Sequence, residues 1–206
     1  MKDSQGDPHR GVSRRGFLTG TGAAAAAMTG LTGELTAPAT AQPATGAPAF
    51  GPAAARLELT VNGKKVTTSV EPRVTLLDAL RNYLDVTGCK RVCDRGTCGA
   101  CTVILNGRTV YSCTMLAVEA RGADVRTAES LGAGRLDPVP GAFADNDAQQ
   151  CGFCTPGFVV SMRAALDKNP NATPEQIEAA LTGNICRCGT YQQMRDAILQ
   201  LTRKGG

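Results

Sequence analysis

The chain has 206 residues, a formal net charge of +4, nine cysteines and a single histidine, His9. This length suits one or two small domains, and no run of basic residues interleaved with aromatic ones suggests nucleic-acid binding. With histidine confined to the N-terminal segment, the rest of the chain excludes a Rieske centre, an imidazole zinc site and a histidine-based nucleophile.

The N-terminal segment has the layout of an export signal. An arginine pair precedes an uncharged stretch in the residues Ser13, Arg14, Arg15, Gly16, Phe17 and Leu18. This pattern predicts a twin-arginine signal peptide over 1–41, cut after Ala41, and export of the already folded protein to the periplasm. The uncharged stretch over 16–33 is mostly Ala, Gly and Thr, so we expect a cleavable leader and no stable membrane insertion of the mature chain.

A linker and a first hairpin follow the leader. Residues 42–55 are rich in Ala, Pro, Thr and Gly, which predicts a flexible linker. Apolar and polar residues then alternate over 57–61, and a second strand is expected over 64–70. The Asn62-Gly63 pair between them is typical of a two-residue hairpin turn.

A short helix, a cysteine-bearing loop and a second hairpin come next. Thr75 is a candidate N-cap for a helix whose apolar face consists of Leu76, Leu77, Leu80 and Leu84. Residues 89–101 lack periodicity and carry two glycines, which predicts a loop wrapped closely around a bound group. The stretch 102–112 repeats the hairpin pattern, so we expect a small mixed sheet with one packed helix.

Helical patterns dominate the C-terminal part. Gly and Pro punctuate residues 131–140, where the strand patterns stop. Apolar residues recur at helical spacing over 158–166, and Thr173 with Gln176 forms a candidate capping box for a further helix. A last amphipathic helix is expected over 194–201.

The first of two cysteine groups consists of Cys93, Cys98, Cys101 and Cys113. Its C-x4-C-x2-C spacing with a distant fourth cysteine is the plant-type [2Fe–2S] arrangement. Gly96 and Gly99 would let backbone N–H groups approach the cluster sulfurs. A four-cysteine zinc site is the alternative, although zinc ribbons use two matched C-x2-C pairs, which this group lacks.

The second group consists of Cys151, Cys154, Cys186 and Cys188, arranged as C-x2-C, thirty-one residues and C-x-C. This spacing alone is less specific, since C-x-C is also compatible with half a zinc site or with a disulfide. The group lies at predicted helix ends, and the positive N-terminus of a helix suits an anionic cluster. The ninth cysteine, Cys89, is expected to be a small buried apolar side chain.

Three strings carry a resemblance to a known family. They are Cys93-Asp94-Arg95-Gly96-Thr97-Cys98-Gly99-Ala100-Cys101-Thr102-Val103, Gln150-Cys151-Gly152-Phe153-Cys154-Thr155-Pro156-Gly157 and Gly183-Asn184-Ile185-Cys186-Arg187-Cys188. With them the chain resembles the iron–sulfur subunit of molybdenum hydroxylases, the xanthine oxidase and aldehyde oxidoreductase family. The resemblance implies an α+β chain, with a plant-ferredoxin-like (β-grasp) [2Fe–2S] domain over 56–131 and a four-helix-bundle [2Fe–2S] domain over 132–206.

The resemblance also implies partners and cofactor contacts. A large subunit would carry molybdopterin, in its cytosine dinucleotide form, and electrons would pass from it to the second cysteine group and then to the first. The acceptor would be an FAD subunit or a c-type cytochrome. Gln150 and Cys188 correspond to residues that contact the pterin. Two departures from the family pattern are Cys89, where many relatives have threonine, and the order Gly189-Thr190-Tyr191 in place of Thr-Gly-Tyr.

We therefore expect the electron-transfer subunit of a periplasmic oxidoreductase of the aldehyde oxidoreductase, isoquinoline 1-oxidoreductase or xanthine dehydrogenase type. The complex would oxidise aldehydes or N-heteroaromatic compounds, and this chain would supply no catalytic residue. A free-standing periplasmic ferredoxin is the main alternative. A zinc-stabilised interaction domain and a disulfide-stapled secreted protein are the other two.

Overall fold

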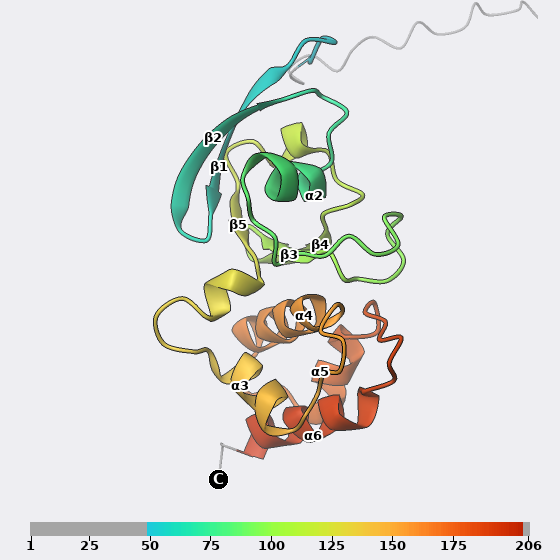
Figure 1. The fold of residues 1–206 in the computed structure, drawn as a ribbon. Helices are drawn as coiled ribbons and strands as arrows, with labels where there is room; N and C mark the ends of the chain where they lie inside the picture. The colour runs from blue at the N-terminus through green and yellow to red at the C-terminus, as the bar shows by residue number, and fades with distance from the viewer. Residues whose placement is uncertain (1–48, 204–206) are drawn as a thin grey trace, which may run out of the picture. The chain divides into compact units, whose positions relative to one another are not determined.

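The computed structural model describes residues 49–203 (Figure 1). The predicted signal peptide over 1–41 lies outside the described residues, as does the part of the predicted linker before Ala49. From Ala49 to Ala54 the chain forms neither helix nor strand. No helix among residues 49–203 is both long and apolar enough to cross a membrane.

A five-stranded mixed sheet forms the first half of the described chain, with strand order β2-β1-β5-β3-β4. The strands are β1 (Ala55–Val61), β2 (Lys64–Val70), β3 (Thr102–Leu105), β4 (Arg108–Tyr111) and β5 (Asp124–Arg126). β1 runs parallel to β5, while the β1–β2, β3–β4 and β3–β5 pairs are antiparallel. The sheet confirms both predicted hairpins, but β5 has only three residues and its pattern was too short to predict.

Both hairpin turns adopt the backbone conformation that their Asn-Gly pairs favour. Asn62 and Gly63 have φ values of 50° and 78°, and Asn106 and Gly107 have φ values of 47° and 80°. Positive φ at both central residues defines the type I′ turn, whose twist matches that of the flanking strands. The Asn106-Gly107 turn therefore fixes the register in which β3 pairs with β4.

A short helix packs on the sheet. α2 (Leu76–Asp78) continues into η2, a turn of π-helix over Ala79–Tyr83. As predicted, Thr75 caps the helix, because its hydroxyl accepts a hydrogen bond from the Asp78 backbone N–H at 3.1 Å. Leu76, Leu77 and Leu80 are fully buried in the core beneath the sheet. Two 3₁₀ turns, η3 (Ala117–Ala120) and η4 (Ala128–Leu131), flank β5.

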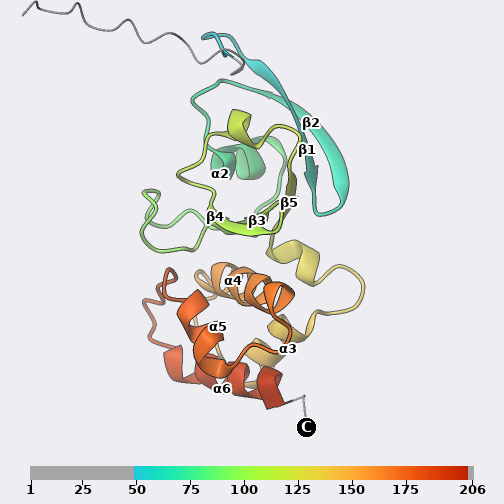
Figure 2. The same cartoon turned by 180° about the vertical axis from the view of Figure 1, so that it is seen from behind.

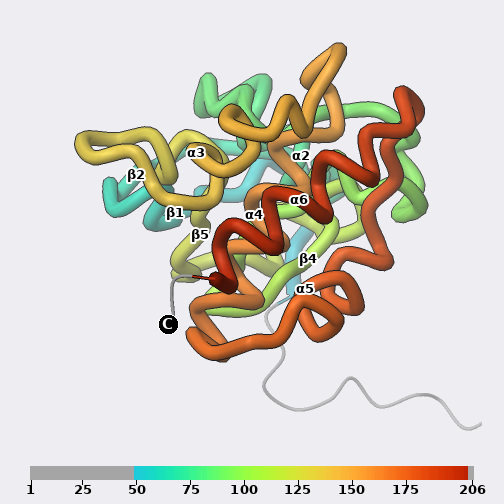
Figure 3. Tube along the Cα trace, turned by 90° about the horizontal axis from the view of Figure 1, so that it is seen from below, coloured from blue at the N-terminus to red at the C-terminus, as the bar shows by residue number. Residues whose placement is uncertain are grey.

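Four helices form the second half: α3 (Pro138–Asp145), α4 (Thr155–Lys168), α5 (Pro174–Ala180) and α6 (Tyr191–Thr202). α6 packs against α3 and α5, as the view from below shows (Figure 3). The predicted helices over 158–166 and 194–201 are confirmed, as is the capping box of Thr173 and Gln176. α3 begins inside the stretch 131–140, where the Gly and Pro residues predicted an end to regular structure. Pro138 instead occupies the first turn behind the N-cap Asp137, where proline is favoured.

The two halves have separate cores that meet at β3 and α4. One core gathers the apolar residues beneath the sheet, and the other gathers those among the helices. Ile104 of β3 belongs to the helical core, while its neighbour Val103 belongs to the sheet core, because successive strand residues face opposite sides. α4 consequently lies against β3 and β4 in both views (Figures 1 and 2).

Candidate metal centres

The first cysteine group is assembled by one loop and one hairpin. Cys93 and Cys98 lie in the loop between η2 and β3, and both are half-buried. Cys101 directly precedes β3 and Cys113 follows β4, and both are buried. The β3–β4 hairpin brings the last two together, since the Ser112 backbone N–H and its hydroxyl both donate to the Cys101 carbonyl.

Backbone N–H groups point at the sulfur atoms of this group. Gly96 N–H donates to Cys113 Sγ at 3.3 Å, and Thr97 N–H donates to Cys93 Sγ at 3.4 Å. Gly96 has a φ of 70°, and a Cβ there would lie 2.7 Å from Thr114 Cγ2, so the turn requires glycine. N–H groups aimed at thiolates offset their negative charge, which suits an anionic iron–sulfur cluster.

The two ends of the group differ in acidity. Backbone hydrogen bonds, first that from Arg95, lower the pKa of Cys93 to about 6. Burial raises the pKa of Cys101 to about 12. The thiols interact in pairs, Cys93 with Cys98 and Cys101 with Cys113. In a four-cysteine [2Fe–2S] centre each iron takes two thiolates, so paired thiols are the donor set that such a centre uses.

The second group is assembled at helix ends, as its position in the sequence predicted. Cys151 lies in the loop before α4, and Cys154 is the N-cap residue of α4. Cys186 and Cys188 lie in the loop between α5 and α6. The Sγ atoms of Cys188 and Cys151 are 3.5 Å apart, and Cys154 interacts with Cys186. This group therefore also consists of two pairs, of which one is exposed and the other largely buried.

Burial and local hydrogen bonds shift the pKa values of the buried pair, Cys154 and Cys186. Burial raises the pKa of Cys154 to about 12. Burial also opposes ionisation of Cys186, but the hydrogen bonds from Thr190, Cys154 and Gly189 together outweigh it and bring the pKa to about 7. Thr190 Oγ1 lies 3.2 Å from Cys186 Sγ.

Among residues 49–203, no three cysteine, histidine or acidic side chains converge closely enough to hold a single metal ion.

The order Gly189-Thr190-Tyr191 has a structural role at this site. Gly189 has a φ of 83°, which glycine adopts without strain. This turn directs the Thr190 hydroxyl to Cys186 Sγ and lets the Tyr191 hydroxyl oxygen accept the Cys186 backbone N–H at 2.8 Å. Thr190 and Tyr191, which follow the last cysteine, therefore fix the position of Cys186. The sequence pattern alone did not predict this role.

An exposed apolar surface surrounds the second group. Phe153, Ile185 and Tyr191 are 55%, 48% and 46% exposed, and Cys151 and Cys188 are exposed beside them. Gln150 precedes Cys151 and is exposed as well. The structure thus places the two residues predicted to contact a pterin, Gln150 and Cys188, at the same exposed end of the helical half.

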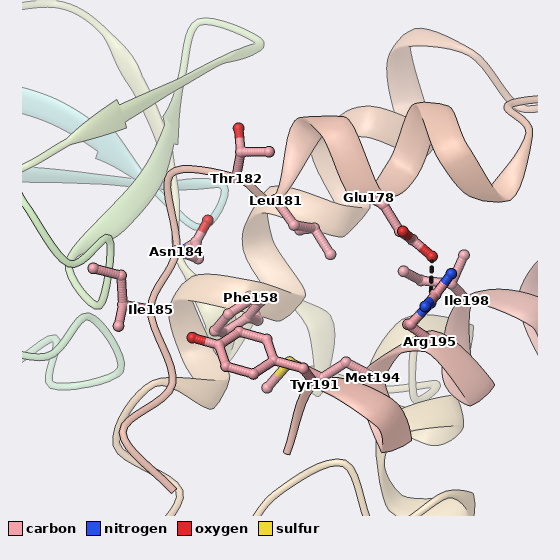
Figure 4. Close-up of a pocket in the computed structure, with 10 residues that line it drawn as sticks. All are labelled: Phe158, Glu178, Leu181, Thr182, Asn184, Ile185, Tyr191, Met194, Arg195 and Ile198. Carbon is pink, nitrogen blue, oxygen red and sulfur yellow. Dashed lines mark hydrogen bonds and ion pairs between the residues drawn. The ribbon is translucent and has the colours of Figure 1, made fainter. Parts of the chain in front are cut away.

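A cavity of about 410 Å³ adjoins this surface between α4, α5 and α6 (Figure 4). The rings of Phe158 and Tyr191 meet edge to face in its wall, with centroids 6.4 Å apart. An ion pair between Glu178 and Arg195, at 2.9 Å, closes its far rim. This cavity could not be predicted from the sequence, because its lining depends on how α4, α5, α6 and the loop between α5 and α6 pack together.

Cys89, the ninth cysteine, lies in the same core as Cys101 and Cys113 of the first group. It is 1% exposed within the core beneath the sheet, as expected for a small apolar side chain. Burial, followed by the charge of Glu129, raises its pKa to about 11.

Comparisons with known proteins agree with this geometry. Residues 59–130 match the family model described as a 2Fe-2S iron-sulfur cluster binding domain, and residues 127–199 match a [2Fe-2S] binding domain. The chain is 44% identical over 154 residues to the nicotine 6-hydroxylase small subunit of Paenarthrobacter nicotinovorans, covering 73% of this chain and 93% of that protein. It is 39% identical over 208 residues to the aldehyde oxidoreductase iron-sulfur-binding subunit PaoA of Escherichia coli (strain K12). That alignment covers 93% of this chain and 89% of PaoA.

Solved structures share the fold. Quinoline 2-oxidoreductase from Pseudomonas putida 86 superposes with a TM-score of 0.68 at 38% identity, covering 74% of this chain and 98% of that chain. The aldehyde oxidoreductase of Desulfovibrio gigas gives a TM-score of 0.68 at 36% identity, covering 72% of this chain and 17% of that much longer one. The two-domain layout expected from the sequence is therefore found in solved oxidoreductases.

Proposed function

The chain belongs to the iron–sulfur-binding small subunits of the molybdenum hydroxylases, and from this premise we propose that it relays electrons through two [2Fe–2S] clusters. The first cluster would be held by Cys93, Cys98, Cys101 and Cys113, and the second by Cys151, Cys154, Cys186 and Cys188. When bound, such clusters take up and release electrons singly, at potentials set by hydrogen bonds and solvent exposure.

One observation carries the proposal: the two thiol groups are joined by a single backbone hydrogen bond. Ile185 N–H donates to the carbonyl oxygen of Cys98 at 3.0 Å. Cys98 belongs to the first group, and Ile185 directly precedes Cys186 of the second. Two metal centres built for separate structural purposes need no such contact, whereas an electron relay requires its centres to be close.

The family resemblance implies the direction of electron flow, and the exposure of the second group supports it. The second group opens onto the exposed apolar surface of Phe153, Ile185 and Tyr191, and exposed apolar patches mark interaction sites. A large subunit carrying molybdopterin, in its cytosine dinucleotide form, would dock there, with Gln150 and Cys188 contacting the cofactor. Electrons would then pass from the second group to the first, and onward to an FAD subunit or a c-type cytochrome.

The proposal includes export. The arginine pair Arg14-Arg15 supports a twin-arginine signal and a periplasmic location. The alignment with PaoA supports a shared N-terminal segment, since it covers 93% of this chain, against 73% for the nicotine 6-hydroxylase small subunit. A folded, cluster-loaded chain is the kind of cargo that this route carries.

The substrate would be an aldehyde or an N-heteroaromatic compound. PaoA is a subunit of an aldehyde oxidoreductase, while other relatives are subunits of nicotine 6-hydroxylase and nicotinate dehydrogenase. Oxidation of the substrate would take place in the large subunit. This chain would contribute the path by which electrons leave the large subunit, and the surface on which the large subunit docks.

The test is metal analysis and low-temperature EPR on the chain purified with its native partners. We expect about four irons and four acid-labile sulfides per chain, and two distinct rhombic signals after reduction. Molybdenum should be found in a co-purifying large subunit. A colourless chain containing zinc or only disulfides would contradict the proposal, and a loaded chain that purifies alone would favour the free-standing ferredoxin.

A further inference from the structure

A buried side-chain amide connects the two cysteine groups, in addition to the backbone hydrogen bond between Ile185 and Cys98. Asn184 lies in the loop between α5 and α6, two residues before Cys186, and is 7% exposed (Figure 4). Its Nδ2 donates to the carbonyl oxygen of Gly99 at 3.0 Å, and Gly99 directly follows Cys98. The side chain thus reaches from the loop of the second group into the loop of the first.

The other end of the same amide is fixed to α4. Ser161 Oγ donates to Asn184 Oδ1 at 2.9 Å, and Ser161 is itself buried. An asparagine amide both donates and accepts, so one side chain satisfies Gly99 and Ser161 together. Aspartate would offer only acceptors to the Gly99 carbonyl, and an apolar residue would leave the buried Ser161 hydroxyl without this acceptor.

The surrounding backbone is shaped to bring the two loops close. A Cβ added to Gly157 of α4 would overlap the Gly99 carbonyl oxygen and lie 3.1 Å from Ala100 Cα. Gly99 has a φ of 70°, and a Cβ there would lie 2.6 Å from both Asn184 Nδ2 and the Gly183 carbonyl oxygen. Glycine at these positions allows a separation that side chains would prevent, and the amide of Asn184 holds it.

We propose that Asn184 is a positioning residue that sets the separation and relative orientation of the two cysteine groups. The inference rests on the proposed function, because the separation matters when both groups hold clusters. Electronic coupling between two centres falls exponentially with their distance. A clasp that prevents the two loops from moving apart therefore keeps transfer of one electron, from the second group to the first, fast and uniform.

The test measures the separation directly in the cluster-loaded protein. Pulsed EPR reports the dipolar interaction between the two reduced clusters, and iron analysis reports their content. The variants are Asn184→Ala, which removes the side-chain hydrogen bonds to Gly99, Ser161 and Thr102, and Ser161→Ala, which removes only the bond to α4. Asn171→Ala is the matched control, since Asn171 is an exposed asparagine in the loop before α5.

We expect the wild type and Asn171→Ala to share one narrow distribution of inter-cluster distances. Asn184→Ala at full iron content should give a broader distribution and a lower dipolar frequency, and Ser161→Ala should give a smaller shift in the same direction. If Asn184→Ala loads poorly, the Ser161→Ala shift decides the inference.

Loaded variants with the wild-type distribution would show that Asn184 serves stability alone, and would overturn the inference. A wild type whose two reduced clusters show no dipolar interaction would overturn it as well. Either result leaves the proposed function standing, because both clusters are then present. A wild-type chain that takes up no iron would instead overturn the proposed function, and this inference with it.

Discussion

The phenol of Tyr111 donates a hydrogen bond to the carbonyl oxygen of Gly183 at 2.7 Å, across 72 positions of sequence. Tyr111 ends β4, and Gly183 follows α5, so the bond ties the sheet to the loop of the second cysteine group. A Cβ on Gly183 would overlap the Tyr111 hydroxyl. The sheet and the helical half are therefore joined by a polar contact that depends on a tyrosine and a glycine together.

Replacing Tyr111 with phenylalanine should lower the free energy of unfolding of the loaded protein by about 1 kcal/mol, the typical net contribution of one hydrogen bond. The ring remains, so packing against the sheet core is kept. Denaturant unfolding of both proteins at equal iron content measures the difference. Tyr83→Phe is the control, since Tyr83 is 47% exposed, and a loss of equal size there would refute the assignment to this bond.

The substitution Gly157→Ala has two opposite effects on stability, and they differ in size. Alanine is favoured over glycine inside a helix by about 0.5–1 kcal/mol, but overpacking a closely packed site costs about 1–3 kcal/mol. The new Cβ would overlap the Gly99 carbonyl, so overpacking should win and the variant should unfold at lower temperature. Calorimetry of the loaded protein measures the change.

Gly141→Ala is the matched control for that variant. Gly141 lies within α3, and the nearest atom to a Cβ there would be Leu136 Cδ2 at 3.9 Å. With room for the methyl group, only helix preference acts, and the variant should be more stable than the wild type. Opposite signs for the two glycines are expected. A stabilised Gly157→Ala would mean that α4 and the cysteine loop are not in close contact.

Much of the local structure could be predicted because it is encoded locally. Asn-Gly pairs require positive φ at both residues, and Thr173 with Gln176 satisfies a helix N-terminus by itself. The cysteine groups were recognisable by spacing. β5 was missed because its three residues owe their strand structure to pairing with β1 and β3.

The contacts between the two groups could not be predicted from spacing or periodicity. Asn184 meets Gly99 at a separation of 85 positions, and a buried asparagine has no periodic pattern. Gly157 directly precedes the predicted helix over 158–166, and nothing in that pattern indicates its close approach to Gly99. Long-range polar contacts depend on how two domains pack, and no short stretch of sequence specifies that packing.

Cys89 should be chemically silent in the folded protein. Burial raises its pKa to about 11, so almost no thiolate exists at pH 8, and the nucleophile in alkylation is the thiolate. In the loaded native protein iodoacetamide should leave Cys89 unmodified, and reaction should appear only on unfolding. Mass spectrometry of peptides spanning this residue measures the labelling.

Two substitutions distinguish Cys89 from the proposed cluster ligands by the iron content of the chain. Cys89→Ala should keep about four irons per chain, whereas Cys113→Ala should keep about two and lose one of the two EPR signals. Rapid labelling of Cys89 in the folded protein, or iron loss in Cys89→Ala, would show that this cysteine has a role in the site after all.

The arginine pair gives the last prediction, which concerns the segment before the described residues. Changing Arg14→Lys and Arg15→Lys keeps the positive charge but removes the twin-arginine pair. The precursor should then accumulate in the cytoplasm at its full mass, still carrying iron, while the wild type is found in the periplasm shortened by about 41 residues. Fractionation with mass spectrometry measures both quantities. The control is Lys2→Arg, which lies outside the pair and should be exported normally. Normal export of the double variant would show that a different route carries the chain, and loss of iron from a retained precursor would show that the clusters are inserted after export.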